Sequence, residues 1–535
     1  MKKILTYIPS SDLYFFGLIL FAASLPLSKF TMSLAQFVIA GNWLLEMNFR
    51  QKFRMLGQNK TALMLMSLYF LHLAGLIYTT DFTFALNDLR TKLPLLLFPF
   101  LMATSKPLSE KQINYILFFV YAATIVSSLI SLCIFLGFTG KEITDIRQIS
   151  PLISHIRLAL LVCVSVGIAC YFYVFPNHFP MQLNYQKSIQ FLAVISIVWL
   201  MVFLIILESL TGMLLILSGI ICFAFYQIFR VSSTYSTRIK FGLFVLLFSG
   251  GSYLALDYLM KPFQIKEQVQ YETLPQKTAQ GNSYTHHINE KFTENGHYYG
   301  IYQCEEELRA AWNKRSKLSY DATDNKQQAL NFTLMRYLTS RGLTKDAEGV
   351  AQLSETDIKL IEQGITNYKI PFMNPLESRA YQVYCEYQSY RDGYNASGHS
   401  LTMRLHYWQA ASLIIKENFL FGVGTGDTEL AFQKKYNDIN SPLNKEWRHR
   451  AHNQYLTIML TFGLPGILFF LAWLFVPGLI NRKTLHPVYY AFMFVFLISM
   501  LTEDTLETQA GVSFAVFFSC LFLLNSASTN HYKPD

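Results

Sequence analysis

Apolar segments close to twenty residues long recur along the chain, separated by short polar stretches. Segments of this length are typical of membrane-spanning helices. We predict twelve spans, at 13–28, 31–46, 61–78, 91–104, 113–137, 151–175, 189–207, 210–229, 240–258, 455–480, 488–501 and 511–525. The pattern therefore predicts an all-α polytopic membrane protein.

One long polar segment interrupts this pattern. It is too long for a linker and is not of low complexity, so we expect it to fold. Helical periodicity is visible in Gln327–Ser340 and Thr356–Tyr368, and Thr402–Phe419 has the pattern of an amphipathic helix at a bilayer surface. Three regions are predicted: an N-terminal membrane domain of about nine spans (1–258), a large, mainly helical polar loop (259–454) and three C-terminal membrane helices (455–535).

Composition and charge agree with a membrane protein. Hydrophobic residues make up 52% of the chain and charged residues only 15%, against about 25% in soluble proteins. Fifteen Lys and Arg residues lie in the short loops of one side and five in those of the other. The positive-inside rule then places both termini in the cytoplasm and the long polar segment on the opposite side of the membrane. The net charge of +9 is a topological signal, and no nucleic acid partner is expected.

Two local features allow alternative interpretations. Ala22-Ala23-Ser24 would suit signal-peptide cleavage, but a second apolar run starts at Met32, which favours an uncleaved first span. Cys304 and Cys385 lie in the polar segment and could form a disulfide outside the cytoplasm. The Cys and His residues show no zinc-binding spacing, so we expect neither a metal nor a cofactor.

The candidate chemistry is concentrated between Arg404 and Gly466. In order, the sequence has Arg404-Leu-His-Tyr-Trp408, then Gly422-Val-Gly-Thr-Gly426, then Arg448-His-Arg450-Ala-His452-Asn453-Gln-Tyr-Leu456, then Gly463-Leu-Pro-Gly466. Arginine binds phosphate groups through two parallel hydrogen bonds, and histidine can accept a proton near neutral pH. The glycine run follows no strand and precedes no Gly-Lys-Ser, so we interpret it as a set of tight turns.

This order of motifs resembles the C-terminal signature of the O-antigen ligase and polymerase superfamily over about sixty residues. The resemblance implies a metal-independent glycosyltransferase of the membrane-embedded, GT-C-like type. Its partners would be the lipid bilayer, an undecaprenyl-pyrophosphate-linked glycan as donor and a lipid A–core sugar as acceptor. The resemblance also implies that the protein lies in the cell inner membrane and that the polar loop 259–454 is periplasmic. His452 matches the histidine treated as the catalytic base, and Arg404 matches the arginine before tryptophan. Arg157 is our candidate for the family's arginine at the outer end of a middle span.

The remaining candidate residues are supported less directly. Arg448 and Arg450 lie just before His452 and could contact pyrophosphate, and His155 shares a helical turn with Arg157. Glu503 could orient the histidine or bind sugar hydroxyls, although an ordinary solvated acidic loop is the favoured interpretation. Many family members have Ser-Arg-Gly at the start of a later span where this chain has Leu210-Thr-Gly, which leaves the choice of pyrophosphate-binding arginines open.

Three other functions compete with ligation. A polymerase would extend a lipid-linked glycan with the same chemistry, and a protein O-oligosaccharyltransferase would modify Ser, Thr or Tyr. A transporter or flippase would also suit many spans. Transporters usually place ionisable groups at the bilayer midplane, whereas here the predicted spans are almost free of charge apart from Arg157.

Overall fold

The structure is a computed structural model that describes residues 10–140, 146–181, 186–226, 273–287, 292–391, 395–482 and 485–525, with Gly393 and scattered positions between 239 and 258. The chain divides into two compact units. Unit 1 comprises Met1–Ile220 and Arg404–Asp535, and unit 2 comprises Ile221–Met403.

Unit 1 is built of helices. Its N-terminal part contains α1 (Ser10–Ser24), α2 (Lys29–Leu45), α3 (Phe49–Gln58), α4 (Lys60–Ala74), η1 (Gly75–Tyr78), α5 (Phe82–Lys92), α6 (Pro94–Ala103), α7 (Glu110–Phe135), η2 (Ile146–Ile149), α8 (His155–Val174), η3 (Pro176–His178), α9 (Gln186–Ile206) and α10 (Leu210–Tyr226). Its C-terminal part contains α17 (Ser400–Glu417), α18 (Thr428–Asp438), η8 (Lys445–Trp447), α19 (Gln454–Ile480), α20 (Pro487–Thr502), η9 (Thr505–Glu507) and α21 (Gln509–Leu523).

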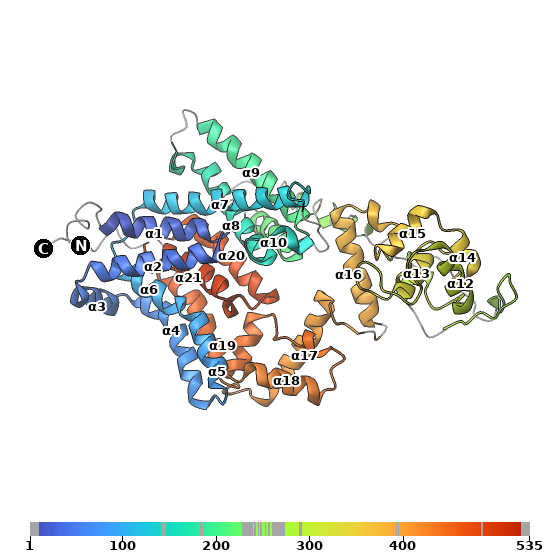
Figure 1. Cartoon of the computed structure of the whole chain (residues 1–535). Helices are drawn as coiled ribbons and strands as arrows, with labels where there is room; N and C mark the ends of the chain where they lie inside the picture. The colour runs from blue at the N-terminus through green and yellow to red at the C-terminus, as the bar shows by residue number, and fades with distance from the viewer. Residues whose placement is uncertain are drawn as a thin grey trace. The chain divides into compact units, whose positions relative to one another are not determined.

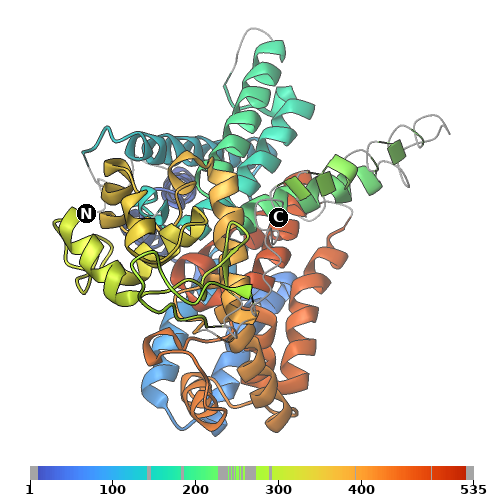
Figure 2. The ribbon, with the colours of Figure 1, turned by 90° about the vertical axis from the view of Figure 1, so that its right-hand side faces the viewer.

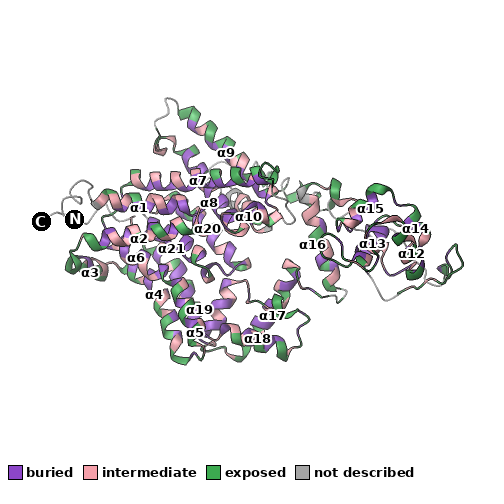
Figure 3. Ribbon diagram, in the orientation of Figure 1, coloured by how far each residue is buried: buried purple, intermediate pink, exposed green. Residues whose placement is uncertain are grey.

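Helices from the two ends of the sequence form one core in unit 1. The C-terminal helices α19 and α21 pack against the N-terminal helices α4 and α6, and α20 packs against α8 (Figure 1, Figure 2). The helix α21 is buried on nearly every side, and Figure 3 shows the buried faces of its neighbours turned towards this centre. A helix that is apolar all round is typical of a protein core or of a membrane span.

The helices of unit 1 run between two ends. At one end, which we call the site end, lie η1, α5, the start of α8 and the loops that precede α19 and α21. The opposite end is fixed by three hydrogen bonds: Trp43 Nε1 to Thr104 Oγ1 at 2.7 Å, Leu108 N to Asn525 Oδ1 at 2.8 Å and Asn481 Nδ2 to Thr61 Oγ1 at 3.2 Å. Each of these bonds joins two segments that the predicted topology places on the same side of the membrane. Which end faces the cytoplasm stays a prediction.

Five helical segments are long and apolar enough to cross a membrane. They are Lys60–Tyr78, Glu110–Phe135, His155–Val174, Gln186–Ile206 and Gln454–Ile480. Four further predicted spans are shorter apolar helices, at Ser11–Ser24, Thr211–Ile220, Pro487–Thr502 and Gln509–Leu523. The predicted spans 31–46 and 91–104 are present as the helices α2 and α6. The predicted span 240–258 is described only at scattered positions. An all-α membrane protein is therefore supported, and the total of twelve spans stays a prediction.

Unit 2 has its own helical core. It contains the hairpin strands β1 (Thr293–Glu294) and β2 (His297–Tyr298), then α12 (Glu305–Arg315), α13 (Leu330–Ser340), α14 (Ala347–Ala351), α15 (Glu355–Glu362), η7 (Ile370–Phe372) and α16 (Pro375–Arg391). Trp312, Tyr320, Tyr337 and several Leu and Ile side chains are buried together there. The helices predicted within 327–340 and 356–368 are present as α13 and α15. Cys304 and Cys385 are free thiols and do not form a disulfide.

Candidate functional site

One face of α17 holds the segment that carries His452. Arg404, Tyr407 and Trp408 lie three or four residues apart, so they share a face of the helix. Tyr407 donates a hydrogen bond to the Trp447 carbonyl at 2.7 Å, and Trp408 Nε1 donates to the Ala451 carbonyl at 3.0 Å. The rings of Tyr407 and His452 lie 5.6 Å apart. The Arg-x-x-Tyr-Trp motif therefore positions the histidine as well as supplying an arginine.

A carboxylate fixes the backbone at His452. Its φ of 45° lies in the left-handed region, which is costly for a residue other than glycine. Asp504 compensates by accepting hydrogen bonds from the backbone N–H groups of His452 at 2.9 Å and Asn453 at 3.0 Å. The Asn453 side chain then caps the start of α19 by accepting from the N–H groups of Tyr455 and Leu456. The His-Asn-x-Tyr-Leu motif is thus a helix cap that leaves the imidazole in a fixed place.

Glu503 connects the two motif residues. Its carboxylate pairs with Arg404 at 2.9 Å, and its second oxygen lies 3.9 Å from His452 Nδ1. Burial lowers the pKa of His452 below its ordinary value; the negative charge of Glu503 opposes this shift, and Arg404 adds to it. At neutral pH the imidazole is therefore uncharged and able to accept a proton.

Arg157 approaches the same loop from α8. Its Nη2 atom donates to Thr508 Oγ1 at 3.1 Å and, more weakly, to the Thr505 carbonyl at 3.4 Å. Its Nη1 atom is buried and has no hydrogen-bond acceptor among the described residues. Gly511 makes room for this contact, because a Cβ atom there would lie 2.9 Å from Arg157 Cζ. We call the segment Glu503–Thr508 the acidic loop.

A buried ionic network anchors the far side of the acidic loop. Glu507 accepts from Lys92 Nζ at 2.8 Å, Arg450 Nη1 at 2.9 Å and Gln454 Nε2 at 3.1 Å. Lys92 also pairs with Asp88 at 2.5 Å and is 1% exposed. Burial alone would raise the pKa of Glu507, but the two cations hold it well below its usual range. The loop is therefore fastened to α5 by Lys92, and to the segment at the start of α19 by Arg450 and Gln454.

Two of the residues proposed from the sequence, Arg448 and His155, have no contact with the acidic loop among the interactions described above. The Arg448 guanidinium is directed towards the loop after α18, where it donates to the Leu443 carbonyl at 2.9 Å and to Asn437 Oδ1 at 2.7 Å. It does not join the residues around the acidic loop. His155 is the first residue of α8, half-buried and two positions before Arg157.

The glycine motifs serve close packing. Gly422 and Gly424 have φ values of 69° and 92°, and a Cβ atom at Gly422 would lie 2.4 Å from the Thr461 backbone. Gly463, with a φ of 66°, breaks α19 into two helices at a kink. Asp427 accepts from the backbone N–H groups of Thr80 and Asp81. The interpretation of the glycine run as tight turns is confirmed, and the turns fasten α17 and α18 to η1 and α19.

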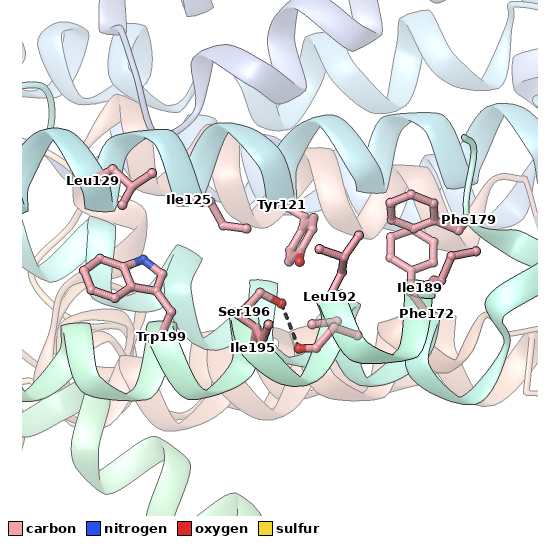
Figure 4. Close-up of a pocket in the computed structure, with 12 residues that line it drawn as sticks. Tyr121, Ile125, Leu129, Phe172, Phe179, Ile189, Leu192, Ile195, Ser196 and Trp199 are labelled. Atoms are coloured by element: carbon pink, nitrogen blue, oxygen red, sulfur yellow. Dashed lines mark hydrogen bonds between the residues drawn. The ribbon is translucent and has the colours of Figure 1, made fainter. Parts of the chain in front are cut away.

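A cavity of about 380 Å³ lies among α7, α8 and α9, lined by Tyr121, Phe172, Leu192, Trp199 and other apolar side chains (Figure 4). Trp199 Nε1 is satisfied by Ser128, and Ser196 donates to its own helix. Ala169 in the wall of the cavity lies twelve residues after Arg157 on α8. At the rise of an α-helix this is a distance of roughly 18 Å. The cavity is lined almost entirely by apolar side chains and lies away from the charged site.

Comparison with known proteins identifies part of the chain. Residues 359–471 match the family model described as O-antigen ligase. This match confirms the resemblance that the motifs from Arg404 to Gly466 predicted. It indicates a membrane protein of the O-antigen ligase and polymerase type with a glycosyltransferase-like activity. A search of curated proteins found no match.

The O-antigen ligase match ends before the acidic loop. The sequence interpretation of this loop as solvated was wrong. Glu503 and Asp504 are each only 8% exposed, so the loop is not solvated as expected. Sequence reasoning also missed Lys92 and Glu507 as an ion pair. The available signal was a cluster of three acidic residues between two apolar helices, where a buried charge needs a partner.

Proposed function

We propose that this chain is a membrane glycosyltransferase that moves a polyprenyl-pyrophosphate-linked glycan to an acceptor hydroxyl on the periplasmic side. We further propose that the acceptor is the lipid A–core sugar. The observation that carries the proposal is the meeting of Arg404, Arg157 and His452 at the acidic loop. Three side chains from distant parts of the sequence supply two cations and a neutral imidazole at one end of unit 1.

The pyrophosphate would be bound by arginines. Arg157 Nη1 has no protein acceptor among the described residues, so a phosphate oxygen could take that place. Arg404 would exchange its pairing with Glu503 for one with phosphate, and Arg450 would add positive charge. Charge-assisted hydrogen bonds from a preorganised site stabilise the negative charge that grows as the sugar C1–O bond breaks. Arg448 is assigned to holding its loop.

His452 would act as general base. It takes the proton from the acceptor hydroxyl, whose oxygen attacks C1 from the face opposite the diphosphate, so the anomeric configuration inverts. The electron pair of the broken bond leaves with the diphosphate, which is stable without a general acid. The apolar cavity of Figure 4 is a candidate place for part of the polyprenyl chain, with its pyrophosphate towards Arg157.

The test is His452→Ala in the purified full chain. The variant is supplied with a polyprenyl-pyrophosphate glycan and lipid A–core. We expect its rate of glycan transfer to be roughly 10²–10⁴-fold lower than that of the wild type, which is the usual contribution of a general base. His287→Ala is the control, because His287 is an exposed histidine in unit 2. Unchanged transfer by His452→Ala would remove the base role.

The same assay separates the alternative functions by its product. Glycan on lipid A–core supports a ligase, a longer lipid-linked glycan supports a polymerase, and glycan on protein supports an O-oligosaccharyltransferase. A transporter is less consistent with the described part of unit 1, where the buried charged side chains lie towards helix ends and in loops. Lys92, Glu503 and Asp504 are at the site end, and Lys52 is at the opposite end.

A further inference from the structure

A short helix at the opposite end of unit 1 has features that catalysis does not use. The helix α3 (Phe49–Gln58) joins α2 to α4 and has ten residues, too few to cross a bilayer. Met47 and Asn48 have φ values of 59° and 38°, so the chain turns sharply between α2 and α3. Two successive left-handed residues other than glycine are costly, and the surrounding contacts must maintain them.

Lys52 fastens α3 to the end of α2. Its Nζ atom donates to the Trp43 carbonyl at 2.6 Å, pairs with Glu46 at 3.0 Å and lies 4.4 Å from the centre of the Trp43 ring. Lys52 is only 4% exposed. One basic residue of α3 is therefore committed to structure, and the orientation of the helix is fixed.

The other face of α3 presents two exposed pairs with helical spacing. Arg50 and Arg54 are both exposed, and so are the neighbouring rings of Phe49 and Phe53, at 41% and 58%. Because residues four apart lie side by side on a helix, the two guanidinium groups are neighbours. Neither arginine forms an ion pair within the described part of the chain, where Glu46 is taken by Lys52.

We propose that α3 binds the headgroups of anionic phospholipids in the leaflet at this end of unit 1. Arg50 and Arg54 would hold the phosphates, while Phe49 and Phe53 enter the boundary between headgroups and acyl chains, as in interfacial amphipathic helices. The apolar helices on both sides keep α3 at the bilayer surface, which favours a lipid over a soluble acidic partner. The inference does not depend on the proposed enzymatic function.

The experiment measures which lipids stay bound to the full-length protein. The chain is reconstituted in vesicles of phosphatidylcholine and phosphatidylglycerol, extracted in mild detergent, and its bound lipids are counted by native mass spectrometry. We expect the wild type to retain phosphatidylglycerol preferentially. In the double variant R50Q/R54Q the preference for phosphatidylglycerol over phosphatidylcholine should fall by up to roughly thirty-fold, because two charges near the membrane surface are removed. R50K/R54K should keep most of it.

Arg90→Gln is the matched control, an exposed arginine at the site end, and should retain phosphatidylglycerol as the wild type does. Equal retention by R50Q/R54Q and wild type, or equal loss in Arg90→Gln, would overturn the proposal. A second measurement needs no variant: raising the ionic strength until the screening length falls from about 10 Å to about 3 Å should weaken the wild-type preference. A preference unaffected by salt would also contradict it.

Discussion

At the scale of single residues, the site depends on how His452 is held. Its backbone conformation would cost about 1–3 kcal/mol in isolation, and Asp504 offsets this by accepting two backbone hydrogen bonds. Burial and Arg404 keep the imidazole uncharged, whereas Glu503 favours its charged form. The opposed effects of Arg404 and Glu503 place the protonation of His452 under the control of two neighbouring side chains.

This balance predicts the pH dependence of transfer. The base works only when it is neutral, so activity should fall as the pH drops through the pKa of His452, which lies below its ordinary value. Glu503→Gln removes a negative charge that raises this pKa, so the acid limb should move to lower pH. The measurement is kcat/KM against pH for both proteins. Glu110→Gln, an exposed carboxylate at the opposite end, is the control. A limb that stays in place or moves to higher pH would contradict the electrostatic argument.

At the scale of elements, the acidic loop between α20 and α21 organises the site. Its first residues face α17 and the start of α19, its last residues face α8, and Glu507 binds α5. The loop can approach α8 because Gly511, the third residue of α21, has no side chain. A Cβ atom at Gly511 would lie 1.9 Å from the Thr505 carbonyl oxygen and 2.9 Å from Arg157 Cζ.

Gly511→Ala should therefore move the loop or Arg157. We expect transfer to fall by tenfold or more, and the free energy of unfolding to fall by about 1–3 kcal/mol, as for overpacking in other cores. Activity assays and thermal melting measure the two effects. Gly41→Ala in α2 is the matched control, because nothing lies within 4 Å of its added Cβ atom. It should be neutral or stabilise by up to about 1 kcal/mol. Wild-type transfer by Gly511→Ala would show that the loop does not need this contact.

Elements also show what local sequence can and cannot predict. The helices follow from apolar runs and caps, such as the Ser109–Gln112 capping box before α7, and these signals are local. The site motifs of α17 and α19 were recognisable for the same reason. The burial of Glu507 was not predictable, because its partners Lys92 and Arg450 are 415 and 57 residues away. A solvated acidic loop and a buried one have the same local pattern.

At the scale of the whole molecule, the O-antigen ligase match crosses the division between the units. It begins in α15 of unit 2 and ends within α19 of unit 1. The recognisable motifs lie after Arg404, in unit 1, and their partners Arg157 and Lys92 come from the N-terminal helices. The candidate site is therefore complete only when both ends of the sequence fold together, and a C-terminal fragment should not be active.

The predicted topology places the site end and unit 2 on the periplasmic side and α3 on the cytoplasmic side. Single cysteines test this after the seven native cysteines are replaced. Asn87→Cys at the site end, Gln280→Cys in unit 2 and Gln51→Cys in α3 are all at exposed positions. A membrane-impermeant maleimide should label the first two in intact spheroplasts and the third only after permeabilisation. The reverse labelling pattern would show that the protein has the opposite orientation in the membrane. Labelling of position 280 only after permeabilisation would place unit 2 on the cytoplasmic side and contradict the predicted periplasmic loop.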